Sequence, residues 1–195
     1  MSMDKTQENK LKKLGIFTLA QANELGISQQ SLSKLVKQEK IKRVDRGIFL
    51  HPEASLEREY DFQIACAKLG PDAVIGGLSA LFYYNLVDQS PKQTWVLVPP
   101  HKITSKRAYR LIRTQIPLDK GVVIGNGYKI VSIERAIAES FKLASKIGER
   151  TAIKACRIAI QQKQTTLKKI GTTAKELGLD SYLTKYFEMI IGAIQ

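Results

Sequence analysis

The chain has 195 residues, of which 31 are lysine or arginine and 18 are aspartate or glutamate, so its formal net charge at pH 7 is +13. Hydrophobic residues make up 44% of the sequence, a share that permits buried cores and excludes a wholly disordered basic tail. This length allows one large domain or two small ones, and the positive charge indicates a phosphate polymer or an acidic protein as partner.

The cysteines and the apolar stretches indicate in which cellular compartment the protein is expected. Cys66 and Cys156 lie far apart and in no CxxC pair, so the sequence favours neither a disulfide framework nor a metal site. The least charged stretch, residues 73–87, is interrupted by glycines and is shorter than the roughly 20 residues that a membrane helix needs. The N-terminus is polar and basic, without the apolar core of a signal peptide. We therefore expect a cytoplasmic protein without a metal or a membrane partner.

Two short helices are expected before residue 26. The first covers residues 3–14 and ends at Gly15. The second follows Thr18, whose hydroxyl can cap the free amides of the first turn, and Gln21 can reach back to complete a capping box. Both helices are therefore bounded by residues that suit helix ends.

A third helix, over residues 29–38, is expected after a very short connection. Gly26 suits the left-handed residue that closes the second helix, and Ser28 is the expected N-cap of the third. Turns of 100° per residue place Leu32 and Leu35 on the inner face of this helix. Two helices joined by a tight turn that contains a glycine are typical of a helix-turn-helix.

The outer face of the third helix carries amides, hydroxyls and ammonium groups but no carboxylate. Such a face can hydrogen-bond to base edges and phosphates in the major groove of DNA. An ordinary solvated helix more often mixes glutamate with its lysines. The residues expected to contact DNA from this helix and its N-cap are Ser28, Gln29, Gln30, Ser33, Lys34 and Lys37.

Residues 41–50 form two apolar runs around a turn in which Gly47 can take a positive φ, a pattern that predicts a β-hairpin. Helix-turn-helix and hairpin together predict a winged-helix DNA-binding domain over residues 1–52. The alternative is a small helical domain that binds no nucleic acid, because helix-turn-helix units also dock proteins. The hairpin cations expected to contact backbone phosphates are Lys42, Arg43 and Arg46.

Beyond residue 52 the pattern changes to alternating strands and helices. Short apolar runs bounded by glycine, proline or asparagine predict strands, and apolar residues at helical spacing predict helices. We expect strands or hairpins at residues 73–76, 94–98, 110–116 and 121–131, and helices at residues 54–69, 78–86, 133–143, 149–162, 166–170, 173–177 and 180–194. The predicted class is α+β, with a winged helix-turn-helix followed by a mixed α/β domain over residues 53–195 that is helical after residue 132.

Two further basic islands lie in this second domain, within residues 101–115 and 142–175. On the helix expected at 149–162, basic residues recur at i, i+4 and i+7 and form one stripe, which can meet phosphate or an acidic protein surface. A plain solvated face is the equally weighted alternative. The residues of this possible second basic surface are Lys106, Arg107, Arg110, Arg150, Lys154 and Arg157.

Motifs for catalysis are missing from the sequence. His51 and His101 each stand alone beside a proline, as polar surface groups would, and neither belongs to an HExxH motif. The chain contains no GxxxxGK phosphate loop, no GxSxG elbow and no Asp-x-Asp metal pair. We expect no enzymatic activity, no catalytic residues and no cofactor.

Several segments resemble one known family, the AbiEi antitoxins of bacterial abortive-infection systems. The segments that resemble its winged-helix N-terminal domain are residues 15–28, 32–37 and 41–49. Residues 75–86 are similar to the Ser-Ala-Leu helix of that family. Residues 122–139 resemble its strand and following Glu-Arg helix, with Glu139 where many relatives carry aspartate.

The resemblance implies a phage-defence antitoxin with two tasks. Its winged helix would bind inverted repeats of double-stranded DNA in its own promoter and repress transcription, with the C-terminal domain helping cooperative binding. That domain would also counteract a cognate nucleotidyltransferase toxin of the AbiEii type. Two alternatives remain: a winged-helix regulator with an unrelated sensor or partner-binding domain and no toxin, and an RNA-binding protein that stacks bases on Tyr83, Tyr84 and Tyr109.

Overall fold

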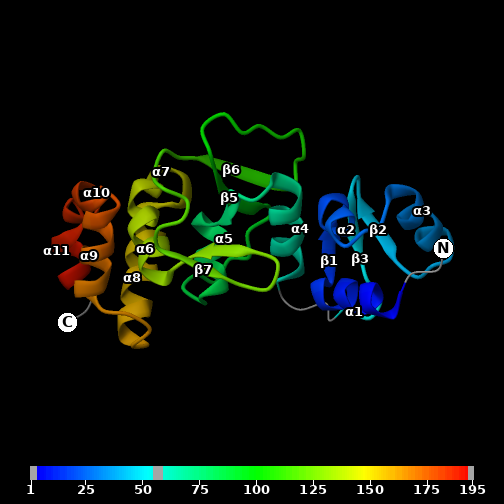
Figure 1. Ribbon diagram of the computed structural model, residues 1–195. Coiled ribbons are helices and arrows are strands. Elements are labelled where there is room, and N and C mark those ends of the chain that lie inside the picture. The colour runs from blue at the N-terminus through cyan, green and yellow to red at the C-terminus, as the bar shows by residue number, and fades with distance from the viewer. Residues whose placement is uncertain (1–3, 55–58, 193–195) are drawn as a thin grey trace. The chain divides into compact units, whose positions relative to one another are not determined.

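A computed structural model describes residues 4–54 and 59–192, and the chain divides into two compact units (Figure 1). The first unit consists of Met1–Pro71 and Gly125–Tyr128, and the second consists of Asp72–Ile124 and Lys129–Gln195. The fold is of the α+β class, as the sequence predicts, and the first unit has the elements of a winged helix-turn-helix. No helix among the described residues is long and apolar enough to cross a membrane.

The first unit combines helices with one small antiparallel sheet. Its elements are, in chain order, α1 (Lys5–Leu14), β1 (Ile16–Thr18), α2 (Leu19–Glu24), α3 (Gln29–Lys37), β2 (Lys42–Asp45), β3 (Ile48–Leu50) and α4 (Tyr60–Leu69). The sheet has the order β1-β3-β2, so that β3 pairs with both neighbours. The predicted helices and hairpin of this segment are confirmed.

Capping residues fix where the helices of this unit begin. The Thr18 hydroxyl accepts from the amide of Gln21 at 3.3 Å, and the Gln21 side chain accepts from the Thr18 amide at 2.8 Å, which is the predicted capping box. Gly26, which follows the end of α2, has φ +76°, a backbone conformation that residues other than glycine rarely adopt. Gln7 of α1 donates to the carbonyl of Leu25 at 3.0 Å and so ties α1 to the turn.

The strand β1 was not predicted from the sequence. It pairs antiparallel with β3, with Phe17 opposite Phe49, and the two rings stack with centroids 5.8 Å apart. An aromatic pair of this kind adds about 0.5–1.5 kcal/mol to the burial of its surface. Both rings belong to a buried core to which α1, α2 and α3 also contribute, for example through Leu11 of α1 and Leu32 of α3.

The opposite face of the sheet is covered by α4. Ile16, Ile48 and Leu50 are buried there, and Tyr60 and Ile64 of α4 pack against them. The helix predicted at 54–69 is confirmed over Tyr60–Leu69, while residue 54 is not helical and residues 55–58 lie outside the described residues. Because α4 packs on the winged-helix sheet, the first compact unit extends to Pro71.

The second unit is built on a mixed five-stranded sheet with helices packed beside it (Figure 1). Its elements are β4 (Val74–Ile75), α5 (Gly77–Tyr83), β5 (Thr94–Val98), β6 (Tyr109–Arg113), β7 (Val122–Ile124), β8 (Lys129–Val131), α6 (Ile133–Lys142), α7 (Ala144–Ile147), α8 (Glu149–Gln161), α9 (Leu167–Glu176), α10 (Asp180–Thr184) and α11 (Phe187–Gly192). The strand order is β6-β5-β4-β8-β7, parallel in the pairs β5·β6 and β4·β8. Helix α5 packs on β5, α6 packs on α5, and α8 and α9 pack on α6.

Two helix predictions in this unit are wrong. Residues 166–170 and 173–177 belong to one helix, α9, in which Gly171 causes no break because Ile170 and Ala174 on either side are buried. The single helix predicted at 180–194 is divided into α10 and α11. Between them Tyr186 is buried and its ring stacks on Phe141 at 5.3 Å, while residues 193–195 lie outside the described residues.

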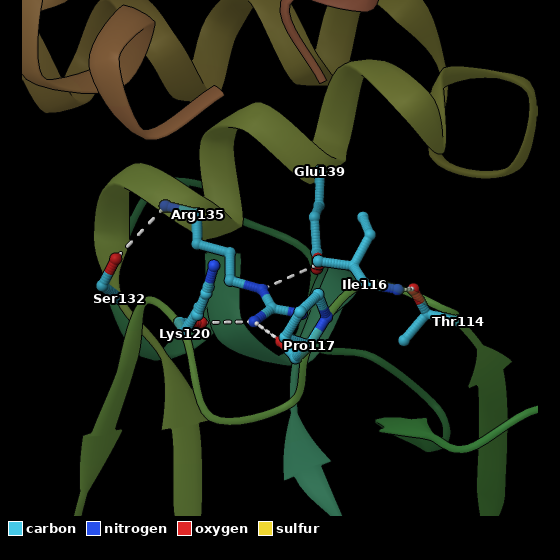
Figure 2. Close-up of polar contacts among 7 residues, drawn as sticks. All are labelled: Thr114, Ile116, Pro117, Lys120, Ser132, Arg135 and Glu139. Carbon is cyan, nitrogen blue, oxygen red and sulfur yellow. Dashed lines mark hydrogen bonds and ion pairs between the residues drawn. The ribbon is translucent and has the colours of Figure 1, made fainter. Parts of the chain in front are cut away.

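A buried arginine of α6 fastens this helix to the segment between β6 and β7 (Figure 2). Arg135 has no exposed side-chain surface, and its Nε donates to Glu139 Oε1 at 2.9 Å. Its Nη1 donates to the carbonyl of Pro117 at 2.8 Å and also to the carbonyl of Lys120. One arginine therefore holds two loop carbonyls and one carboxylate, while Ser132 caps the same helix as predicted.

Candidate nucleic-acid interface

The exposed side of α3 consists of the residues that the sequence selects for DNA contact. Leu32 and Leu35 of this helix are buried, whereas the six selected residues, Ser28, Gln29, Gln30, Ser33, Lys34 and Lys37, are all exposed. Exposure is a structural fact, but contact of these residues with DNA remains a prediction.

Local hydrogen bonds divide these side chains into two groups. Ser28 Oγ accepts from the amide of Ser31 at 3.2 Å, which is the predicted N-cap. Ser33 Oγ donates to the carbonyl of Gln29 at 2.9 Å, so this hydroxyl offers only its lone pairs. The side-chain amide of Gln30 has no hydrogen-bond partner among the residues that the structure describes. Its NH2 donors and its carbonyl acceptor are therefore both available.

Charge on α3 is entirely positive. Lys34 and Lys37 are exposed, the helix contains no acidic residue, and neither ammonium group forms an ion pair within the described part of the chain. A phosphate that approaches this face displaces water from these groups and no protein carboxylate.

The wing is a short hairpin with its cations outward. Its turn at Arg46 and Gly47 is possible because Gly47 has φ +72°. The carbonyl of Gly47 accepts from the amide of Leu19 at 2.9 Å, which ties the tip of the wing to the start of α2. Lys42 and Arg43 on β2 are exposed, as is Arg46.

The acid of the wing, Asp45, pairs with a lysine of α4. Asp45 Oδ2 lies 3.1 Å from Lys68 Nζ on α4, and Asp45 Oδ1 accepts from the backbone amide of Arg46 at 2.6 Å. Arg43 Nε contacts the carbonyl of Asp45 at 3.4 Å. In residues 4–54 and 59–192, no ion pair involves the side chains of Lys42, Arg43 or Arg46.

The six residues of the possible second basic surface do not all line one site. Arg110 on β6 and Arg150 and Lys154 on α8 line one groove of about 520 Å³ in the second unit. Lys106 and Arg107, in the loop before β6, and Arg157, further along α8, are exposed but do not line it.

Further residues of this groove were missed by sequence reasoning. Lys92, in the loop before β5, and Lys146, on the four-residue helix α7, add two cations to its lining. Trp95 lies opposite Arg110 in the parallel register of β5 and β6, and the guanidinium carbon sits 4.3 Å from the ring centroid. No local pattern marks Lys92 or Lys146, whereas correct pairing of the predicted strands would have brought Trp95 and Arg110 together.

Other candidate residues have structural roles. Tyr84 donates its hydroxyl to the carbonyl of Val131 at 2.9 Å, and burial raises the pKa of this phenol to about 12. Its ring meets that of Tyr83 edge to face at 5.1 Å. His51, predicted to be a surface group, is instead buried and accepts from the amide of Glu53 at 3.3 Å. Among the described residues, no three histidine, cysteine, aspartate or glutamate side chains gather as a metal site.

One comparison with known proteins bears on this interface. Residues 7–51 match a family model described as "Transcriptional regulator, AbiEi antitoxin". The matched segment runs from α1 through β3 and therefore covers the helix-turn-helix and the wing. A comparison with curated proteins finds no match.

Proposed function

We propose that this chain is an antitoxin and a transcriptional autorepressor. Its winged helix binds inverted repeats in the promoter of its own operon, and its C-terminal domain counteracts a nucleotidyltransferase-like toxin of the AbiEii type. The observation that carries the proposal is the family match over α1 to β3, on a segment whose recognition helix exposes amides and ammonium groups without a carboxylate.

Base reading in this proposal is assigned to the N-terminal half of α3. Gln30 is the principal candidate because its side-chain amide is uncommitted among the described residues and glutamine can bond adenine through both its donor and its acceptor. Gln29 lies at the exposed first position of the helix, and the Ser33 hydroxyl can accept a bond from a base or a water. These side chains specify the sequence, and the cations around them provide affinity.

Phosphate contact is assigned to five cations of the winged helix. If all five neutralise a phosphate, the logarithm of the binding constant falls with the logarithm of salt concentration with a slope of about −4.5. The cations are Lys34, Lys37, Lys42, Arg43 and Arg46.

The DNA-binding part is tested with the full chain and a labelled promoter repeat. Arg43→Ala and Arg46→Ala should each weaken binding to every sequence and reduce the salt slope by about one unit. Lys168→Ala is the matched control, since it removes one exposed charge from α9 of the second unit. Equal losses of salt slope in the control and the wing variants would refute the assignment of the wing.

The antitoxin part is best tested without truncation. Removal of residues 1–52 would strip β1 and β3 from the apolar face of α4, so a failure of the fragment could reflect misfolding. A full-length variant with Lys34→Ala, Arg43→Ala and Arg46→Ala keeps this packing. Expressed from a foreign promoter, it should still protect cells from the toxin while it fails to repress the native promoter. Loss of protection at an unchanged protein level would contradict the separation of the two tasks.

A further inference from the structure

We propose that the groove in the second unit lined by Trp95, Arg110 and Arg150 binds a phosphate-bearing small molecule of nucleotide size. This inference goes beyond the proposed function, which assigns the groove no ligand. The volume of about 520 Å³ lies within the range of small-molecule sites, which is roughly 300–1,000 Å³.

The groove combines apolar and cationic parts in the way that such a ligand requires. Leu78, Val87 and Ile147 supply apolar surface, whereas Trp95 is only 5% exposed and carries Arg110 over its ring. A planar base or another apolar group can lie on this surface. Amides and a hydroxyl for its polar edge are present in the lining as Gln89, Gln93 and Thr151.

Positive charge in the lining exceeds negative charge by a wide margin. Lys92, Lys146 and Arg150 are exposed, and none of them forms an ion pair within the described residues. The acid of the lining, Asp88, pairs with Lys154 at 2.5 Å. Cations held close together without counterions repel one another, and an anion with several charges relieves that repulsion.

Arg110 is held in place by an aromatic ring. Its guanidinium lies over the ring of Trp95, with the guanidinium carbon 4.3 Å from the ring centroid, and its N–H groups can bind phosphate at two points. Gly77 makes room for the ring beneath, because a Cβ at this position would lie 2.6 Å from Trp95 Cε3. The arginine is therefore oriented before a ligand arrives, which reduces the entropic cost of binding.

The concave shape and the apolar residues of the lining favour a small ligand over a DNA duplex. A duplex presents phosphates on a convex surface and keeps its bases stacked inside, so it would leave these apolar residues without contact. A nucleotide or another phosphorylated metabolite can contact both the apolar and the cationic residues of the lining. Nucleoside triphosphates and pyrophosphate separate these cases, because pyrophosphate carries the charge without a base.

The experiment is a titration of the full-length protein followed by the fluorescence of Trp95, the single tryptophan of the chain. The four ribonucleoside triphosphates, pyrophosphate, a nucleoside and a short DNA duplex serve as probes. We expect saturable one-to-one binding of at least one triphosphate or of pyrophosphate, with a Kd below about 1 mM. Preference for a triphosphate identifies a nucleotide ligand, and equal binding of pyrophosphate identifies an oligophosphate.

Variants show whether the groove is the site. Arg150→Ala removes a cation that bonds to no other described residue and should weaken binding by about tenfold or more, as expected for a charge-assisted bond. Arg110→Ala should weaken ligand binding to a similar extent. Because this substitution alters the environment of Trp95, its binding is measured by calorimetry and not by fluorescence. Lys168→Ala should leave binding unchanged. Saturation by duplex alone, no saturation by any small probe up to about 1 mM, or equal losses in all three variants would overturn the proposal.

This outcome is independent of the proposed function. Promoter binding by the winged helix and protection from the toxin can both persist when the groove binds no small molecule. A positive result together with failed protection would instead support the alternative of a regulator with a sensor domain.

Discussion

Replacement of Arg135 by methionine is predicted to destabilise the second unit strongly. The variant leaves the buried carboxylate of Glu139 without its cation and releases the carbonyls of Pro117 and Lys120 (Figure 2). Removal of one partner of a buried pair typically costs about 3–5 kcal/mol, because the remaining charge stays buried without compensation. This loss is a large fraction of the 5–15 kcal/mol that is typical of a small domain.

The pH dependence of this loss follows from the carboxyl group. Burial already raises the pKa of Glu139 in the native protein, against the opposing effect of the Arg135 charge. Without the arginine, the pKa of Glu139 rises further above its unfolded value. Stability is then fully present below the unfolded pKa and is lost as the pH rises through the folded pKa, so the variant should lose less at pH 5 than at pH 8.

Urea denaturation at both pH values provides the assay. A double variant, Arg135→Met with Glu139→Leu, removes both charges and should recover part of the loss, because no carboxylate is left buried alone. A loss of less than about 1 kcal/mol in the single variant at pH 8 would refute the reasoning. So would a double variant as unstable as the sum of the two single variants.

Two further predictions concern the helices around the candidate sites. Burial raises the pKa of the Cys156 thiol to about 12, so a thiol reagent at pH 8 should label native protein at Cys66 and reach Cys156 only after unfolding, which mass spectrometry can follow. Because only the unfolded thiol ionises above about pH 8.5, the contribution of Cys156 to stability should fall by up to about 1.4 kcal/mol per pH unit towards pH 12. Cys156→Ala should make the decline of stability with pH shallower by that amount. Thr18→Ala removes the N-cap of α2 and should cost about 1 kcal/mol in urea denaturation, while Thr18→Ser should cost much less; equal losses would show that the cap is not the cause.

The parts of the fold that depend on neighbouring residues could be predicted from the sequence. Thr18, Ser28 and Ser132 are N-caps as expected, because a hydroxyl that precedes an apolar helical pattern acts within three residues of itself. The exposed face of α3 follows from helical periodicity for the same reason.

Features that depend on distant residues could not be predicted in this way. The strand β1 exists because Phe17 pairs with Phe49, and nothing in the residues next to Phe17 specifies that partner. The break between α10 and α11 depends on Tyr186, whose ring stacks on Phe141 of α6. The groove is likewise assembled from α5, residues 87–93, β5, β6, α7 and α8, so its lining becomes visible only when these parts are packed together.

Whether α3 reads the base sequence of a promoter repeat is tested most directly at Gln30. The affinities of the native chain and of Gln30→Ala are measured, at one salt concentration, for the promoter repeat and for repeats with single base-pair changes. We expect Gln30→Ala to lose about 1–3 kcal/mol of binding free energy on the native repeat and almost nothing on a repeat changed at one particular base pair. An equal loss on every sequence, or no loss on any, would contradict base reading by α3.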